Sequence, residues 1–143
     1  MGERKGQMDE RELVLSMEQW AATHREELAK DIIKLVNYKS VAVPGEGGYA
    51  FGTGCKDCAD AMADMGRDAG FEIDNDDYYT LSVLMPGKTD KEIGILGHLD
   101  VVPEGEGWHY EPYNAVEKDG FIIGRGSNDN KGSVLMSLYV MKF

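Results

Sequence analysis

A long amphipathic repeat near the start of the chain places the first constraint on its fold. From Glu10 to about Tyr38, apolar residues recur every three or four positions, which is the spacing of one face of an α-helix. This stripe consists of Leu13, Met17, Trp20, His24, Leu28, Ile32 and Leu35. The segment therefore predicts a long helix with one face turned to a core. On that face, His24 is expected to be a buried, hydrogen-bonded residue rather than a metal ligand.

After this helix, the sequence alternates between helical and strand-like patterns. A glycine-rich loop over 41–54 precedes a second amphipathic helix, whose apolar face carries Cys58, Met62, Met65 and Ala69. Short apolar runs predict strands at 78–85, 92–96 and 121–124, and a further helix begins at Lys131. The acidic segment Glu72–Asp77 is expected to be a solvated turn. Helices that alternate with strands predict an α/β sandwich.

The charge balance narrows the possible partners. The chain has 143 residues, with 26 acidic against 15 basic side chains and a formal net charge of -11. This balance argues against binding of nucleic acid and of anionic membranes, both of which favour clustered Lys and Arg. No apolar run approaches the roughly 18 residues of a membrane span. Residues 1–9 are expected to be a disordered lead-in, too charged for a signal peptide, and we expect a cytoplasmic protein.

The two cysteines, Cys55 and Cys58, are spaced as C-x-x-C. Cys58 falls on the apolar face of the second predicted helix, which favours a packing role for the pair. A thiol redox pair and half of a zinc knuckle remain open alternatives, although no second C-x-x-C is present.

His98 and Asp100 follow a short apolar run in the segment Gly97-His98-Leu99-Asp100-Val101-Val102-Pro103. The carboxyl end of a strand is where open α/β sheets place their ligand crevices. A neutral imidazole is a good zinc ligand, and a carboxylate two residues later lies on the same side of an extended backbone. Asp100 is therefore a candidate to hold the ring of His98 in position. A His-x-Asp pair in an ordinary surface loop is the alternative.

Asp129 lies in a second segment, Gly124-Arg125-Gly126-Ser127-Asn128-Asp129-Asn130-Lys131-Gly132. It sits in a glycine-rich turn between a predicted strand and a predicted helix. A carboxylate in such a turn can use both oxygens to bridge two metal ions, and it can equally cap the following helix. Because His98 offers a second potential ligand, the metal-binding interpretation of Asp129 is favoured.

Taken together, the two segments resemble the co-catalytic zinc exopeptidases and deacylases. Gly107-Trp108, Pro112-Tyr113 and Lys118-Asp119-Gly120 add to this resemblance, and the long first helix with Phe51-Gly52-x-Gly54 is most similar to the dipeptidase V or carnosinase-like branch. The resemblance covers roughly 10–143. It implies a three-layer α/β sandwich with a mixed, largely parallel sheet, of which this chain is the N-terminal part without the lid domain.

The resemblance also implies the roles of the site residues. His98 would be a terminal ligand of one zinc ion, Asp129 would bridge two zinc ions, and Asp100 would orient His98. Manganese or cobalt can take the place of zinc. The family tends to have a cis peptide after the bridging residue, here Asp129–Asn130. Its general-base glutamate and its remaining ligands follow later in the sequence, so we expect this chain alone to be inactive.

Three functions are therefore compatible with the sequence. The first is hydrolysis of dipeptides or short peptides by the full-length protein, and the second is deacylation of N-acyl amino acids. The third is a non-catalytic truncated module that binds a complementary chain. Apolar surface is expected on 93–96 and on the final helix, which predicts self-association.

Overall fold

The computed structural model describes residues 9–143, in which three α-helices accompany four short strands. In chain order the elements are α1 (Glu10–Val36), the 3-10 helix η1 (Glu46–Gly48), α2 (Thr53–Asp68), β1 (Glu72–Asp76), β2 (Thr80–Leu84), β3 (Val116–Lys118), β4 (Phe121–Ile123) and α3 (Lys131–Lys142). The predicted lead-in lies outside the described residues except for Asp9. Within 9–143 no helix is long and apolar enough to cross a membrane, and the cytoplasmic location stays a prediction.

The predicted first helix is confirmed as α1, and its start is fixed by a capping box. The Asp9 carboxylate accepts a hydrogen bond from the Glu12 backbone N–H at 2.8 Å, and the Glu12 carboxylate accepts one from the Asp9 N–H at 3.2 Å. Only the second half of α1 enters the core, because Leu15 is 56% exposed whereas Leu35 is fully buried. His24 is half-buried and stacks on Trp20, as expected for a packed histidine.

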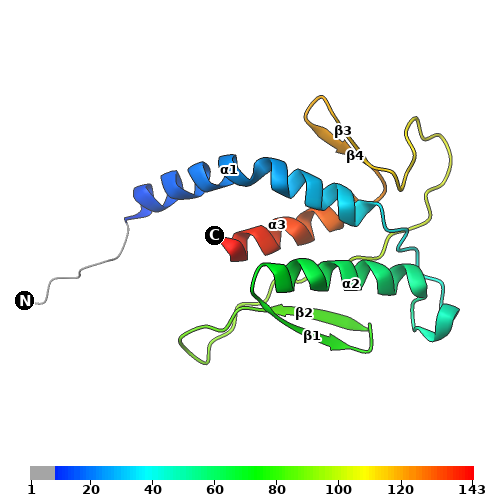
Figure 1. The fold of residues 1–143 in the computed structure, drawn as a ribbon, viewed down its shortest axis with the longest axis horizontal. Helices are drawn as coiled ribbons and strands as arrows, with labels where there is room; N and C mark the ends of the chain where they lie inside the picture. Colours follow the sequence, from blue (N-terminus) through cyan, green and yellow to red (C-terminus); the bar gives the residue numbers. More distant parts are fainter. Residues whose placement is uncertain (1–8) are drawn as a thin grey trace, which may run out of the picture.

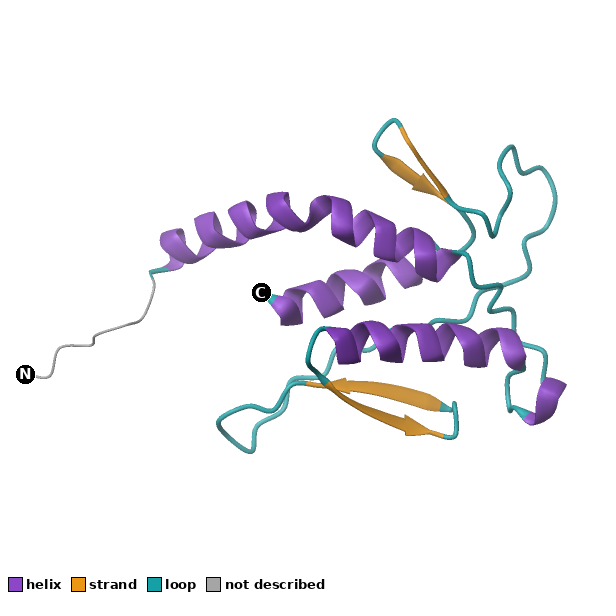
Figure 2. Cartoon of the chain, viewed as in Figure 1, coloured by secondary structure: helices purple, strands orange, loops and turns teal. Residues whose placement is uncertain are grey.

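The core lies where the three helices meet. α1 contacts both α2 and α3, and Figures 1 and 2 show α3 between the other two helices. Leu35 of α1, Cys58 of α2 and Leu135 of α3 are each fully buried in one apolar cluster. The helix predicted after the glycine-rich loop and the helix predicted from Lys131 are thus confirmed as α2 and α3, and their apolar faces meet as the sequence pattern required.

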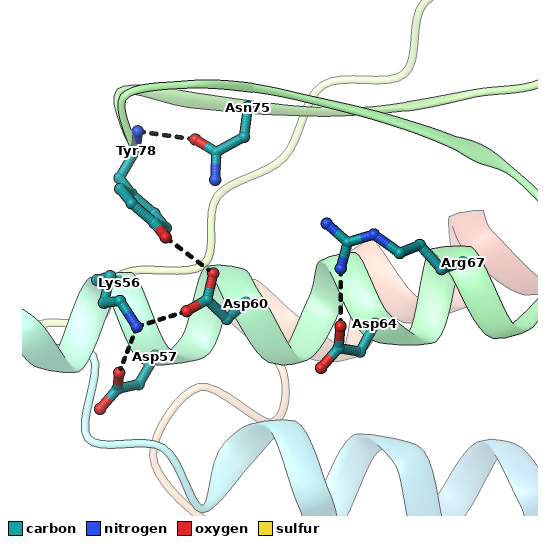
Figure 3. A network of polar contacts seen from close by, with 7 residues as sticks. All are labelled: Lys56, Asp57, Asp60, Asp64, Arg67, Asn75 and Tyr78. Carbon is teal, nitrogen blue, oxygen red and sulfur yellow. Dashed lines mark hydrogen bonds and ion pairs between the residues drawn. The ribbon is translucent and has the colours of Figure 1, made fainter.

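The antiparallel hairpin β1–β2 packs on α2, with Ile73 opposite Val83. Figure 3 shows how its turn is attached to the helix: the Tyr78 hydroxyl donates to Asp60 Oδ1 at 3.1 Å, and the Lys56 ammonium donates to Asp60 Oδ2 at 2.6 Å. The prediction of a solvated turn at 72–77 was wrong, because this segment forms β1. Pairing with β2 and packing of Ile73 on α2 outweigh the acidic composition.

The prediction of a strand at 92–96 was also wrong. This segment has no secondary structure, and Ile93 and Leu96 are 96% and 99% exposed. A strand requires a partner for its backbone N–H and C=O groups, and none of the described residues supplies one here. Apart from the antiparallel pairs β1–β2 and β3–β4, the described residues make one isolated parallel bridge, between Val41 and Val101, which lies outside the named strands. The α/β composition is confirmed, but these residues form no large parallel sheet.

The burial difference along α1 gives a direct test of where the core lies. We expect Leu35→Ala to lower the free energy of unfolding by about 2–5 kcal/mol, since the substitution leaves a cavity among the three helices. Leu15→Ala, on the exposed half of the same helix, is the matched control and should change it by less than about 0.5 kcal/mol. Urea unfolding followed by circular dichroism measures both, and equal effects would contradict this placement of the core.

Candidate metal centre

His98 and Asp129 lie side by side although 31 positions separate them in the chain. His98 follows the irregular segment 92–97, and Asp129 lies in the turn that precedes α3. The distance from His98 Nε2 to Asp129 Oδ1 is 3.0 Å, and the two side chains are 48% and 82% exposed. The structure thus brings the two predicted ligands together at the surface, and their role as ligands stays a prediction.

Asp100 contacts the other nitrogen of the His98 ring. Its backbone carbonyl oxygen lies 3.0 Å from Nδ1, whereas its carboxylate Oδ1 lies 3.4 Å away. The carbonyl is the acceptor with hydrogen-bond geometry, so Nδ1–H donates to it and Nε2 faces the Asp129 carboxylate, to which it donates when the ring is protonated. The hydrogen bond to the Asp100 carbonyl, followed by that to the Asp129 carboxylate, raises the pKa of His98.

The segment that carries His98 is attached to the chain just after α1. Ser40 is fully buried, and its hydroxyl donates to the Leu99 carbonyl at 2.6 Å. The Ser40 carbonyl in turn accepts the Val101 N–H at 3.0 Å, next to the parallel bridge from Val41 to Val101. These contacts fix the backbone on the C-terminal side of His98. On the N-terminal side, a Cβ at Gly97 would lie within 2.6 Å of the Val134 side chain, so α3 requires glycine there.

The turn that carries Asp129 is held from both ends. Gly126 has φ 92°, and its carbonyl accepts the Lys131 N–H at 3.1 Å, while the Gly124 carbonyl accepts the Ser127 N–H at 3.3 Å. The left-handed conformation at Gly126 disfavours any other residue type. The peptide bond between Asp129 and Asn130 is cis, as the resemblance implied. The left-handed Gly126 and the two backbone hydrogen bonds constrain the turn from which the Asp129 carboxylate projects.

The donor atoms at this position fit a zinc ion in type and spacing. At a tetrahedral zinc with bonds of about 2.0–2.1 Å, two ligand atoms lie about 3.3 Å apart, close to the 3.0 Å between His98 Nε2 and Asp129 Oδ1. The number of donors is small. Within residues 9–143, no three His, Cys, Asp or Glu side chains are grouped so that they could hold a metal ion. The described residues thus offer two closely placed donor side chains, His98 and Asp129, for a metal ion.

Cys55 and Cys58 lie beneath this site as free thiols. Cys55 Sγ donates to the Ser40 carbonyl at 3.4 Å and Cys58 Sγ to the Leu99 carbonyl at 3.9 Å. Burial raises the pKa of both thiols, which disfavours the thiolate that redox chemistry needs. These contacts favour the packing interpretation of the pair.

Sequence reasoning missed a hydrogen-bonded centre at Glu104. The Lys39 ammonium donates to the Glu104 carboxylate at 2.8 Å, and the Tyr113 hydroxyl donates to it at 3.0 Å. The Glu104 carbonyl accepts the indole N–H of Trp108 at 2.7 Å and the guanidinium of Arg125 at 3.0 Å. Trp108 and Arg125 line a surface pocket of about 490 Å³. In the sequence, only Gly107-Trp108 and Pro112-Tyr113 pointed to this region, as part of the resemblance. The sequence pattern could not show which side chains contact Glu104.

Comparison with known proteins gives matches to one family of peptidases and to several relatives. The model of peptidase family M20/M25/M40 matches residues 94–142, the segment with His98 and Asp129. A Beta-Ala-Xaa dipeptidase from Lactobacillus delbrueckii is 39% identical over 65% of this chain and 20% of its own length. A putative dipeptidase from Bacillus subtilis is 32% identical over 82% of this chain and 26% of its own. A succinyl-diaminopimelate desuccinylase from Nautilia profundicola is 35% identical over 76% of this chain and 27% of its own.

The imidazole of His98 lies at hydrogen-bond distance from the carboxylate of Asp129, in the turn before α3, and the two define a candidate hydrolytic metal centre. The matches support the resemblance found in the sequence, and the segment 94–142 is the part of this chain that matches peptidase family M20/M25/M40. The chain spans between 20% and 27% of the length of these three relatives.

Glu104 gives a prediction about acid stability. The hydrogen bond from Lys39 is the main cause that lowers the pKa of Glu104 from 4.5 to about 2. A carboxyl group with a lowered folded-state pKa stabilises the fold above its unfolded-state pKa, and this contribution is lost as the pH falls toward 2. Glu104→Gln should therefore be less stable than the parent at pH 6, and the difference should shrink by pH 3. Urea unfolding at both pH values measures it.

The neighbouring exposed residue Glu106 provides the control for this experiment. Glu106→Gln should leave the urea midpoint at pH 6 unchanged. A Glu104→Gln difference of the same size at pH 6 and pH 3 would show that the carboxylate charge does not contribute.

Proposed function

We propose that the whole protein is a metal-dependent hydrolase that cleaves the peptide bonds of dipeptides or short peptides. The observation that carries this proposal is the contact of His98 Nε2 with Asp129 Oδ1 at 3.0 Å, with the opposite ring nitrogen held by Asp100. The relatives from Lactobacillus and Bacillus that are named as dipeptidases support the substrate class.

Each residue has a distinct part in this proposal. His98 is a terminal ligand through Nε2, because its Nδ1–H is engaged by the Asp100 carbonyl. Asp129 offers two carboxylate oxygens at an exposed position, as a bridging ligand of two ions requires. Asp100 orients the imidazole. When bound, zinc, or manganese or cobalt in its place, would polarise the substrate carbonyl and lower the pKa of a bound water molecule. The general-base glutamate belongs to the part of the family sequence that this chain does not match.

Deacylation of N-acyl amino acids is the second candidate. A desuccinylase and a deformylase are among the relatives, at 35% and 31% identity. Both reactions hydrolyse an amide-type bond at the same kind of centre, so the described residues support both. Assay of the purified whole protein on a dipeptide series and on matched N-acyl amino acids separates them by the ratio of kcat/KM values.

A non-catalytic role for the 143-residue chain by itself is the third candidate, and the small number of grouped ligands favours it. Dipeptide hydrolysis by this chain with added zinc, lost in His98→Ala, would exclude that role. The thiol redox alternative is tested by Cys55→Ser with Cys58→Ser, which should retain the function of the protein.

The role of the two proposed ligands is tested by substitution in the whole protein. His98→Ala and Asp129→Asn should each lower the rate of dipeptide hydrolysis at least about 100-fold. Loss of a residue that only supports a metal ligand costs up to about 100-fold, and loss of a ligand itself should cost at least as much. His109→Ala removes an exposed imidazole away from the site and is the matched control, with activity expected to be unchanged. Metal content measured by mass spectrometry should fall with activity. Full activity in Asp129→Asn would contradict the proposal.

We also propose that in the whole protein the described residues belong to a largely parallel, three-layer α/β sandwich. The segment 92–96 has no backbone partner within the described residues, and its apolar side chains are exposed. Such a segment accepts a strand along its edge and brings apolar side chains under cover. In the 143-residue chain, the same surface favours self-association.

Self-association of the chain through this surface gives a further prediction. Leu96 is 99% exposed, so Leu96→Lys should shift the sedimentation profile toward monomer without a loss of helix content. Val14→Lys, on the exposed half of α1, adds the same charge elsewhere and should leave the profile unchanged. A parent chain that stays monomeric at high concentration would exclude this surface as a self-association site.

A further inference from the structure

Lys131, the first residue of α3, is the largest fully buried side chain in the described residues. Its ammonium group donates to the Tyr38 carbonyl at 2.7 Å and to the Leu35 carbonyl at 3.1 Å. Within residues 9–143, no carboxylate lies at salt-bridge distance from it. A lysine buried without a carboxylate is uncommon, because transfer of a charge out of water carries a large free-energy cost.

The C-terminal end of α1 offsets this cost. The last carbonyls of a helix have no partner inside the helix, and the end of the helix carries a partial negative charge. Lys131 satisfies carbonyls at this end with a cation. Burial nevertheless lowers the pKa of the ammonium group, as expected for a charge kept away from water. The buried ammonium group therefore carries a free-energy cost, which its hydrogen bonds to the two backbone carbonyls offset in part.

The same lysine is built into the turn that carries Asp129. Its backbone N–H donates to the Gly126 carbonyl at 3.1 Å. Its aliphatic stem lies over Gly126, where a Cβ would come within 3.3 Å of Lys131 Cδ. Lys131 thus joins the turn at 126–130 to the end of α1 through both its backbone and its side chain.

The His98 segment is attached to the same stretch of chain. The Tyr38 carbonyl accepts a hydrogen bond from the Lys131 ammonium group. Two residues later, the Ser40 hydroxyl donates to the Leu99 carbonyl, and the Ser40 carbonyl accepts the Val101 N–H. Residues 38–40 are therefore a shared anchor for two segments that are far apart in the sequence.

We propose that Lys131 is a positioning residue for the metal centre, which sets the Asp129 carboxylate at its distance from His98 by tying the 126–130 turn to the 38–40 anchor. This proposal rests on the proposed function, because it assumes that His98 and Asp129 bind the metal. Lys131 itself contacts neither substrate nor metal.

Lys131→Met in the 143-residue chain tests the proposal, since it keeps the aliphatic stem and removes the ammonium group. Two readouts are needed. One is zinc affinity by isothermal titration calorimetry, and the other is the backbone amide NMR spectrum of residues 126–130 without metal. We expect about tenfold weaker zinc binding or more, and shifted amide signals across the turn. Lys131→Gln, too short to reach both carbonyls, serves if Lys131→Met does not fold.

A control must separate positioning from general loss of stability. Leu138→Ala removes a buried side chain of the same helix, two turns away from the Asp129 turn, and should lower stability while it leaves zinc affinity and the 126–130 signals unchanged. Unchanged turn signals in the Lys131 variants would overturn the proposal, as would an equal loss of affinity in Leu138→Ala. The NMR readout decides this even where zinc binding is too weak to measure.

Asp129→Asn distinguishes failure of this proposal from failure of the proposed function. Zinc binding that is unchanged in Asp129→Asn would refute the ligand assignment, whatever Lys131 does. Zinc binding that is lost in Asp129→Asn but kept in Lys131→Met, with unchanged turn signals, would refute only the positioning role.

Discussion

The carbonyl and hydroxyl groups at residues 38–40, where the chain leaves α1, are the constraint on which the site depends. Ser40 is fully buried and forms hydrogen bonds with the backbone of Leu99 and Val101, on both sides of Asp100. The Tyr38 carbonyl accepts a hydrogen bond from the Lys131 ammonium group. Buried polar groups of this kind have fixed partners, because an unpaired one costs free energy. Since both halves of the site use the same short segment, the end of α1 determines where His98 and Asp129 lie relative to each other.

This arrangement links the site to the core. On α3, Lys131 and Leu135 are one helical turn apart on the same face, and both are fully buried. Leu135 packs in the apolar cluster with Leu35, and Lys131 continues that face to the carbonyls at the end of α1. A change in the packing of α1 against α3 would therefore alter the Asp129 turn as well. The stability of the core and the geometry of the site are coupled through one helix face.

Much of this organisation follows from the sequence, for identifiable reasons. The apolar period of 10–38 predicted α1, and the metal-competent side chains of the segments 97–103 and 124–132 predicted that His98 and Asp129 would form a pair. The failures have physical causes. The acidic composition of 72–76 concealed a strand that is stabilised by its partner β2, and 92–96 has no partner to pair with. The pattern also could not show that Asp100 acts through its carbonyl, or that Lys131 is buried, since lysine is ordinarily exposed.

The exposure of the pair bears on what the described residues can do chemically. His98 and Asp129 are 48% and 82% exposed, so water surrounds them and weakens any charge interaction between them. Hydrolytic centres gain their strength from preorganised donors and from the exclusion of water, and a catalytic zinc usually has three protein ligands. The described residues fix two donors accurately and leave the surrounding space open. The relatives are several times longer than the segment they share with this chain, so the described residues correspond to one part of them. Preorganisation through the 38–40 anchor then lowers the entropy that assembly of the complete site would otherwise cost.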